Sequence, residues 1–228
     1  MKKLTGIHRS SGPHWVGDGF HVRSVFDYNG LGRELSPFLL LNYGAPTEFP
    51  PGSERRGMGA HPHRGFETVT LAYQGEVQHR DSLLKADIPN VPLAQDAGTV
   101  RVIAGKYGGH TGPAKTFTPI NLWDVSLRAG KSAELPLPDG HTTALLVLGG
   151  TVSVKGEREA TEGVLAVFAR KGDGITVEAN SDALLLVMDG EPIAEPIVGQ
   201  GPFVMNSRAE IAQAFEDHQS GRMGEIPS

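Results

Sequence analysis

Two histidines, His61 and His63, are the residues of this chain whose type and spacing best suit chemistry. They flank a single residue and lead into a β-branched, apolar run, which predicts an extended strand. Successive side chains of a strand point to opposite faces, so both imidazoles are expected on one face, about 7 Å apart. Because imidazole is a common ligand of transition metals, the pair predicts half of a mononuclear metal site.

The spacing leaves the other ligands of such a site open. Glu67 lies four residues after His63 and would share its face in a regular strand, so it is the first local candidate for a third ligand. The alternative is that the Glu67 carboxylate pairs with Arg64 and does not bind a metal. His79 falls in a second predicted strand, after the turn at residues 74–75, and is interpreted as a cross-strand polar residue. A histidine pair satisfied by hydrogen bonds alone is the competing interpretation of the same spacing.

Other catalytic classes find less support in the sequence. His110 lies in a glycine-rich loop and His141 in a turn, and both are expected to face solvent. No Gly-x-Ser-x-Gly stretch marks a nucleophilic serine. The glycine-rich segment from Gly105 lacks the Gly-Lys-Ser/Thr ending of a phosphate-binding loop. Metal chemistry at His61 and His63 is therefore the best-supported class.

The composition narrows the function further. The chain has 228 residues and no cysteine, which excludes disulfides, thiolate catalysis and cysteine-ligated metals, so a metal must use histidine, carboxylate and water. A net charge of −5 without a basic cluster gives no support for direct nucleic-acid binding. No apolar stretch approaches the length of a membrane span, and no apolar segment follows the basic residues at the start. The sequence predicts a cytoplasmic protein without a membrane contact.

Short apolar runs between glycine, proline and asparagine turns predict an all-β protein. Strands are expected at residues 20–26 and 37–43, a loop at 45–59, and a strand at 68–73 that continues from the histidine pair. Residues 83–98 contain two prolines without alternation and are expected to connect two domains. The second half predicts a series of strands, at residues 99–104, 120–127, 142–148, 151–155, 163–169, 174–179 and 183–188.

A single helix is expected near the C-terminal end. Ser207 and Glu210 have the Ser-x-x-Glu form of a capping box, apolar residues follow at helical spacing, and Gly221 ends the pattern. Residues 191–202 carry prolines and no core pattern, which predicts an extended crossing segment.

The histidine stretch resembles the signature of the pirin family of the cupin superfamily. The resemblance rests on His-Pro-His-Arg-Gly-Phe-Glu-Thr-Val-Thr at residues 61–70 and Gly-Glu-Val-Gln-His-Arg-Asp-Ser at residues 75–82. Further matching pieces lie at residues 35–41, 101–105 and 201–206, so the resemblance covers nearly the whole chain.

The resemblance implies a bicupin, with two stacked β-barrels or jelly rolls. The implied domains are an N-terminal pirin-type cupin at residues 1–98, a C-terminal cupin barrel at 99–190, and an extension with one helix at 191–228. It further implies Fe²⁺ or another divalent metal in the N-terminal barrel, held by His61 and His63 and by a later histidine and glutamate.

Two functions follow from the resemblance. One is that of a metal-dependent quercetin (flavonol) 2,3-dioxygenase. The other is that of a non-enzymatic, redox-sensitive regulator that binds a protein partner.

The sequence departs from the family pattern after Ser82. The glycine-rich stretch that carries the later histidine and glutamate is missing, and residues 84–89 resemble the segment that joins the two barrels. We hypothesise an internal deletion that leaves the N-terminal barrel incomplete and poor in metal. An open barrel has unpaired strand edges, so a homodimer through these edges is a further expectation. The C-terminal barrel has no His-x-His pair at the corresponding turn, where residues 137–141 offer only His141, and it is expected to be structural.

Overall fold

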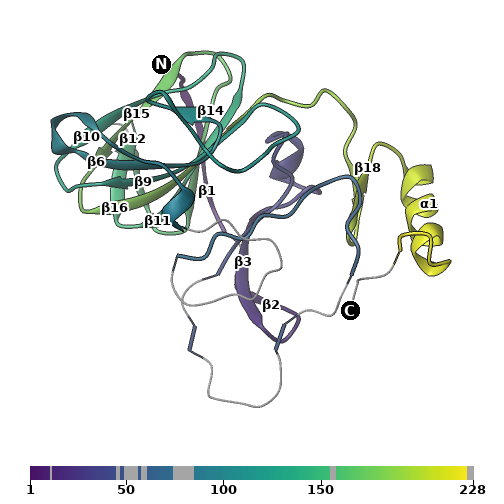
Figure 1. Cartoon of the computed structure of the whole chain (residues 1–228). Helices are drawn as coiled ribbons and strands as arrows, with labels where there is room; N and C mark the ends of the chain where they lie inside the picture. Colours follow the sequence, from purple (N-terminus) through teal and green to yellow (C-terminus); the bar gives the residue numbers. More distant parts are fainter. Residues whose placement is uncertain are drawn as a thin grey trace. The chain divides into compact units, whose positions relative to one another are not determined.

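A computed structural model describes residues 1–10, 12–44, 47–48, 56–57, 61–73, 85–154 and 158–224 of the chain. The chain forms two compact units, each built from separate stretches (Figure 1). The first unit comprises Met1–Ser11, Leu35–Phe38 and His79–Ile193, and the second comprises Gly12–Glu34, Leu39–Gln78 and Ala194–Ser228. The domains that the resemblance implies are continuous, with boundaries at residues 98 and 190. Each unit of the structure instead combines three stretches that are separate in the sequence.

The first unit contains a seven-stranded antiparallel sheet with the strand order β1-β14-β11-β16-β9-β6-β5. Its strands are β1 (Leu4–Arg9), β5 (Asn90–Pro92), β6 (Gly98–Ala104), β9 (Ile120–Leu127), β11 (Thr142–Gly149), β14 (Val164–Phe168) and β16 (Ala183–Gly190). A four-stranded antiparallel sheet has the order β10-β15-β12-β13. Its strands are β10 (Ser132–Pro136), β12 (Thr151–Val154), β13 (Arg158–Thr161) and β15 (Gly174–Ala179). The short strands β7 (Lys106–Tyr107) and β8 (His110–Thr111) form a separate hairpin.

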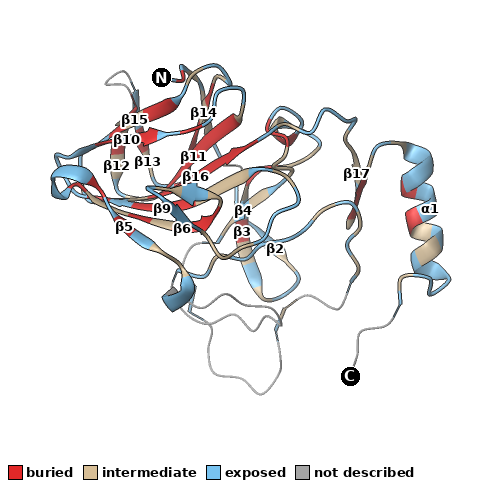
Figure 2. Ribbon diagram, turned by 45° about the horizontal axis from the view of Figure 1, so that its top comes forward, coloured by how far each residue is buried: buried red, intermediate tan, exposed pale blue. Residues whose placement is uncertain are grey.

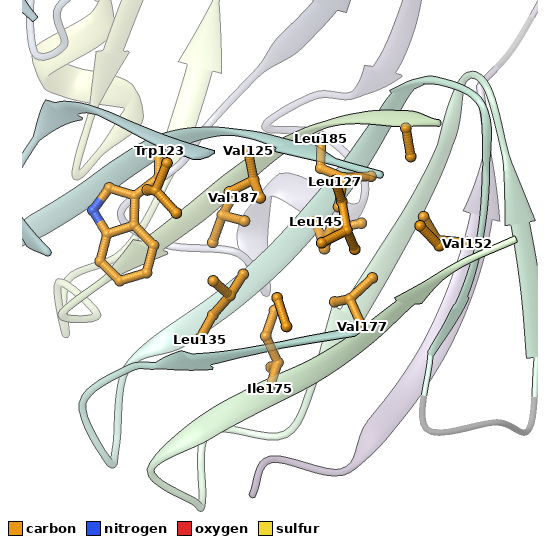
Figure 3. Packing of buried hydrophobic residues seen from close by; sticks show 14 of the residues in the cluster. Trp123, Val125, Leu127, Leu135, Leu145, Val152, Ile175, Val177, Leu185 and Val187 are labelled. Carbon is orange, nitrogen blue, oxygen red and sulfur yellow. The ribbon is translucent and has the colours of Figure 1, made fainter. Parts of the chain in front are cut away.

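The two larger sheets share one apolar core (Figure 3). Alternate residues of β9, Trp123, Val125 and Leu127, are buried in it, as the period of two in a strand requires. Ile175 and Val177 of β15 supply the opposite side from the four-stranded sheet. Figure 2 shows the buried residues concentrated on the strands of these sheets. A sandwich of two antiparallel sheets over a common core is the cupin-type fold that the sequence predicts.

The structure confirms most predicted strands of this unit and corrects three points. The predicted strands at 120–127 and 174–179 coincide with β9 and β15. The segment 83–98 is not only a connection, because its β5 pairs with β6 at an edge of the sheet, where a proline is tolerated. The strands β10, β13 and β1 have no counterpart among the predicted strands, and β1 pairs with β14, which lies far along the chain.

A buried polar network lies in the first unit around Asp189. Its carboxylate accepts hydrogen bonds from Asn121 Nδ2, His141 Nδ1 and Thr143 Oγ1, each at 2.9 Å. The prediction that His141 faces solvent is therefore wrong, because its side chain pairs with a fully buried carboxylate. Lys2 is also fully buried.

The Lys2 ammonium fixes the segment that precedes β1. Its Nζ donates to the backbone oxygens of His141 and Arg170, each at 2.9 Å. Burial lowers the pKa of this ammonium, while the charges of Asp189 and Asp139 act in the opposite direction. The segment is thus held by a buried cation. Its desolvation is offset by two hydrogen-bond acceptors and by the negative charges of Asp189 and Asp139.

Replacing Lys2 by alanine is expected to lower the free energy of unfolding of the first unit by about 1–3 kcal/mol, because the packing of a fully buried side chain is lost and two part-buried carbonyls lose their donor. Denaturant unfolding followed by tryptophan fluorescence measures this. A Trp15→Phe background restricts the signal to Trp123, since the chain has two tryptophans and Trp15 lies in the second unit. The exposed neighbour Lys3, changed to alanine, is the control. Equal unfolding curves for the two variants would contradict the role of the Lys2 contacts.

The second unit contains a three-stranded antiparallel sheet, the order of which is β2-β3-β4. Its strands are β2 (His14–Val16), β3 (Phe20–Phe26) and β4 (Leu41–Tyr43). A separate hairpin joins β17 (Val198–Gln200) to β18 (Phe203–Met205), and the helix α1 (Arg208–Gln219) follows it. Short 3₁₀ turns lie at Leu31–Arg33 in this unit and at Lys85–Asp87 and Ala94–Asp96 in the first.

The predictions for this unit are confirmed in part. The strand at 20–26 coincides with β3, but the predicted strand at 37–43 is reduced to β4, and Leu40 is 49% exposed rather than buried on both faces. Residues 68–73, predicted as a strand, have no strand pairing with another described residue, and the second strand predicted after the turn at 74–75 lies outside the described residues. The described part of the second unit contains no closed barrel.

The helix α1 is the one that the capping box predicts. Ser207 Oγ accepts from the Glu210 amide at 3.2 Å, and Glu210 Oε2 accepts from the Asn206 amide at 3.0 Å. Its residues Ile211 and Ala214 are buried with Phe203 of β18, while most of its other residues are more exposed (Figure 2). No helix among the described residues has the length and apolar character needed to span a membrane.

Candidate metal centre

The imidazoles of His61 and His63 lie together in the second unit. Their ring centroids are 4.8 Å apart, with the ring planes inclined by 43°. The ring of Phe66 packs edge-on against His63 at 4.9 Å. The segment is not paired as a strand, so the two rings share a side without the regular pleat that the sequence predicts. The geometry suits two ligands of one ion in neighbouring coordination positions.

The electrostatics at His63 favour its neutral form. Partial burial lowers the pKa of the His63 imidazole, and the neighbouring His61 lowers it further. Because a metal ligand must offer a lone pair, the neutral imidazole is the form that binds. The direction of this shift favours coordination by His63.

The backbone that follows the pair is fixed by the segment around β18. The Arg64 amide donates to the Pro202 carbonyl at 3.3 Å, and the Val204 amide donates to the Arg64 carbonyl at 3.0 Å. Gly65 has a φ of +88°, and a Cβ added there would lie 1.7 Å from the Val204 oxygen. Only glycine permits this approach. The histidine segment thus depends on residues about 140 positions further along the chain.

The side chain of Arg64 ties the same segment to α1. Its Nη1 donates to Asp217 Oδ2 at 2.6 Å. This bond, with further bonds from Gln213 and Arg222, holds the pKa of the Asp217 carboxyl well below its usual range. The sequence suggests Glu67 as a partner of Arg64. It contains no signal for Asp217, because Arg64 and Asp217 lie far apart in the chain.

The described residues do not complete a metal site. Glu67, the candidate third ligand, is exposed. No group of three or more histidine, cysteine, aspartate or glutamate side chains suited to hold an ion occurs among the described residues. His79 lies outside the described residues. The donor set that the described residues provide is therefore two imidazoles, which fit a divalent metal as a part of its coordination and not as a full set.

The other histidines in the described ranges serve different contacts. His21 packs on Trp15 with ring centroids 4.9 Å apart, and His218 packs on Phe203 at 6.5 Å. His110 Nδ1 lies 3.1 Å from the Gly108 carbonyl oxygen. None of these described histidines forms a group of three or more potential metal ligands with His61 and His63.

The fold and the histidine pair together define a cupin-type protein of two β-rich units. The family model described as Pirin matches residues 19–93, and the model described as Pirin C-terminal cupin domain matches residues 122–224. A Pseudomonas aeruginosa protein named "Putative quercetin 2,3-dioxygenase" is 45% identical over 97% of this chain and 98% of its own length. The chain belongs to the pirin family.

Two further comparisons agree with this assignment. A pirin-like protein of Caulobacter vibrioides is 31% identical over 73% of this chain and 80% of its own length. The crystal structure of a quercetin 2,3-dioxygenase from Acinetobacter baumannii has a TM-score of 0.94 and 38% identity, with all of both chains covered.

The alignment with the Pseudomonas aeruginosa relative spans 282 residues, whereas this chain has 228. Since the alignment covers nearly all of both chains, the relative contains tens of residues that have no counterpart here.

The Asp217 carboxylate predicts a pH-dependent contribution to stability. Its pKa is lower in the folded than in the unfolded chain, so the contribution is present above about pH 4 and declines as the pH falls toward the folded-state value. Asp217→Asn is therefore expected to lower the unfolding midpoint at pH 7 and to have a smaller effect at pH 3. Thermal unfolding followed by circular dichroism measures both values.

The control for this prediction is Glu216→Gln, which removes the neighbouring, 69% exposed carboxylate of the same helix. It is expected to change the midpoint little at either pH, because exposed ion pairs contribute little. An Asp217→Asn effect that does not change between pH 7 and pH 3 would refute the assignment of the lowered pKa.

Proposed function

We propose that this chain binds a divalent metal, with Fe²⁺ as the first candidate, through His61 and His63. We further propose a flavonol as its substrate class, as in the quercetin 2,3-dioxygenases that it resembles. The observation that carries the proposal is the pair of imidazoles with ring centroids 4.8 Å apart. The identity of 45% to a relative named for this activity supports the substrate class.

The metal affinity of the chain is proposed to be low. Affinity for a divalent ion comes from several ligands that are preorganised together, and the described residues supply two. We place the missing residues after Ser82, where the family motif with the later histidine and glutamate is absent from the sequence. The alignment with the Pseudomonas aeruginosa relative spans 282 residues, which is more than the 228 residues of this chain, and this difference supports such a deletion. Turnover of a flavonol is accordingly expected to be impaired.

A second function, that of a non-enzymatic regulator that binds a protein partner, is favoured by the same incomplete donor set. A site with two ligands retains open positions that a second chain can fill. A homodimer is one such assembly, in which unpaired strand edges meet. A cytoplasmic location remains a prediction from the sequence.

The decisive experiment combines native mass spectrometry, metal analysis and an activity assay on the purified chain. Native mass gives the oligomeric state, and elemental analysis gives iron per chain after incubation with Fe²⁺. Aerobic loss of the quercetin absorbance then gives turnover. We expect less than one iron per chain in the monomer, and a turnover that rises with added Fe²⁺ but stays below that of the Pseudomonas aeruginosa relative.

Matched histidine variants test the ligands. His61→Ala and His63→Ala are each expected to lower bound iron at least about tenfold, as the loss of one of few ligands implies. His110→Ala, at an exposed histidine of the first unit, is the control and is expected to leave bound iron unchanged. Iron binding equal to the parent in both ligand variants would reject the site. Stoichiometric iron in the monomer would reject the deletion of two ligands.

A further inference from the structure

A pocket in the second unit carries two arginines and no acid. It has a volume of about 380 Å³ and lies among the turn that ends at Arg33, the strand β17 and the first turn of α1. Arg33 and Arg208 line it, together with the carboxamides of Asn29 and Gln200. No aspartate or glutamate is among its described lining residues. His61 and His63 do not line it either, so the pocket is separate from the candidate metal centre.

The two arginines of this pocket form no ion pair with a carboxylate in the described part of the chain. The side chains of Arg64, Arg101, Arg128 and Arg222 each form an ion pair with a carboxylate. Arg33 and Arg208 form none with a described residue. Two guanidiniums without a carboxylate at one pocket create a positive potential that favours an anion.

The guanidinium of Arg33 is oriented before any ligand binds. Its Nε donates to the Tyr28 carbonyl at 3.1 Å, which leaves its terminal nitrogens for other partners. The Tyr28 hydroxyl in turn donates to the Gly201 carbonyl at 3.2 Å. A Cβ added at Gly199 would lie 2.3 Å from the Tyr28 ring, so the absence of a side chain in β17 lets the ring pack there. A fixed guanidinium loses less entropy on binding than a free one.

The helix completes the pocket on its other side. Arg208 is the first residue of α1, and Ile211 supplies an apolar part of the wall. The nearby Glu210 carboxylate accepts from the Asn206 amide and from the Ser207 hydroxyl in the capping box, and it does not line the pocket. The acid closest in sequence to Arg208 is thus committed to capping the helix.

We propose that this pocket binds a small dianion, either a phosphate-bearing molecule or a dicarboxylate. Two guanidiniums match two negative charges, and each can bind a carboxylate or phosphate through paired N–H groups. The carboxamides of Asn29 and Gln200 supply neutral donors and acceptors for the remaining polar atoms. A volume of about 380 Å³ is near the lower end for small-molecule sites and limits the ligand to a small compound.

The test is isothermal titration calorimetry of the full chain with inorganic phosphate and, separately, with succinate. Sodium chloride keeps the ionic strength constant, and acetate serves as the monoanionic comparison. We expect one-to-one binding of phosphate, of succinate or of both, and at least tenfold weaker binding of acetate. The dianion that binds identifies the chemistry of the ligand.

The variant Arg208→Gln is the main test, because the exposed Arg208 side chain forms no hydrogen bond or ion pair with a described residue that folding would lose. It is expected to weaken dianion binding at least about tenfold, because the ligand loses one charged hydrogen-bonding partner. Arg33→Gln is expected to act similarly. Arg158→Gln, at an exposed arginine of β13 in the first unit, is the charge-matched control and is expected to bind as the parent does.

Two outcomes would overturn the proposal. One is the absence of measurable binding of both phosphate and succinate to the parent chain. The other is equal affinity of the parent and Arg208→Gln, which would assign any binding to another surface.

Discussion

The pairing of β9 with β16 at the interior of the seven-stranded sheet is the interaction on which the first unit depends. These strands have eight residues each and pair along their full length, with Trp123 opposite Val187 and Val125 opposite Leu185. All four side chains are buried, and each large apolar side chain removed from water contributes about 1.5–3 kcal/mol. The remaining strands of the sheet extend outward from this pair, β6 and β5 on one side and β11, β14 and β1 on the other. The core between this sheet and the four-stranded sheet is filled by apolar side chains.

The second unit is held together by different means. Its described sheet has three strands, and a small cluster around Phe203, Ile211 and Ala214 packs α1 against β18. Specific polar contacts carry more of the organisation here. Arg64 alone makes two backbone bonds to the segment around β18 and an ion pair to α1. The position of the candidate metal ligands is therefore a property of the C-terminal segment as much as of the histidine stretch itself.

The helix α1 also links the two candidate sites of this unit. Its first turn contributes Arg208 and Ile211 to the arginine pocket, and its last turns contribute Asp217 to the anchor of Arg64. Both contributions come from one helix of 12 residues, Arg208–Gln219. The sequence separates these elements by more than a hundred residues, and the fold unites them in one unit.

The sequence by itself determined the strands with a clear period of two, the capped helix and the histidine pair. Residues 120–127, 174–179 and 20–26 form strands because their alternation and flanking turns are local signals, and Ser207 with Glu210 marks the helix in the same way. Only the tertiary structure decided which partners these elements have. The pairing of β1 with β14, the burial of Lys2 and the Arg64–Asp217 bond join residues over 130 positions apart, for which local propensity gives no signal. Residues 68–73 show the opposite case, since this β-branched run has no strand assignment, and the second strand predicted after it lies outside the described residues.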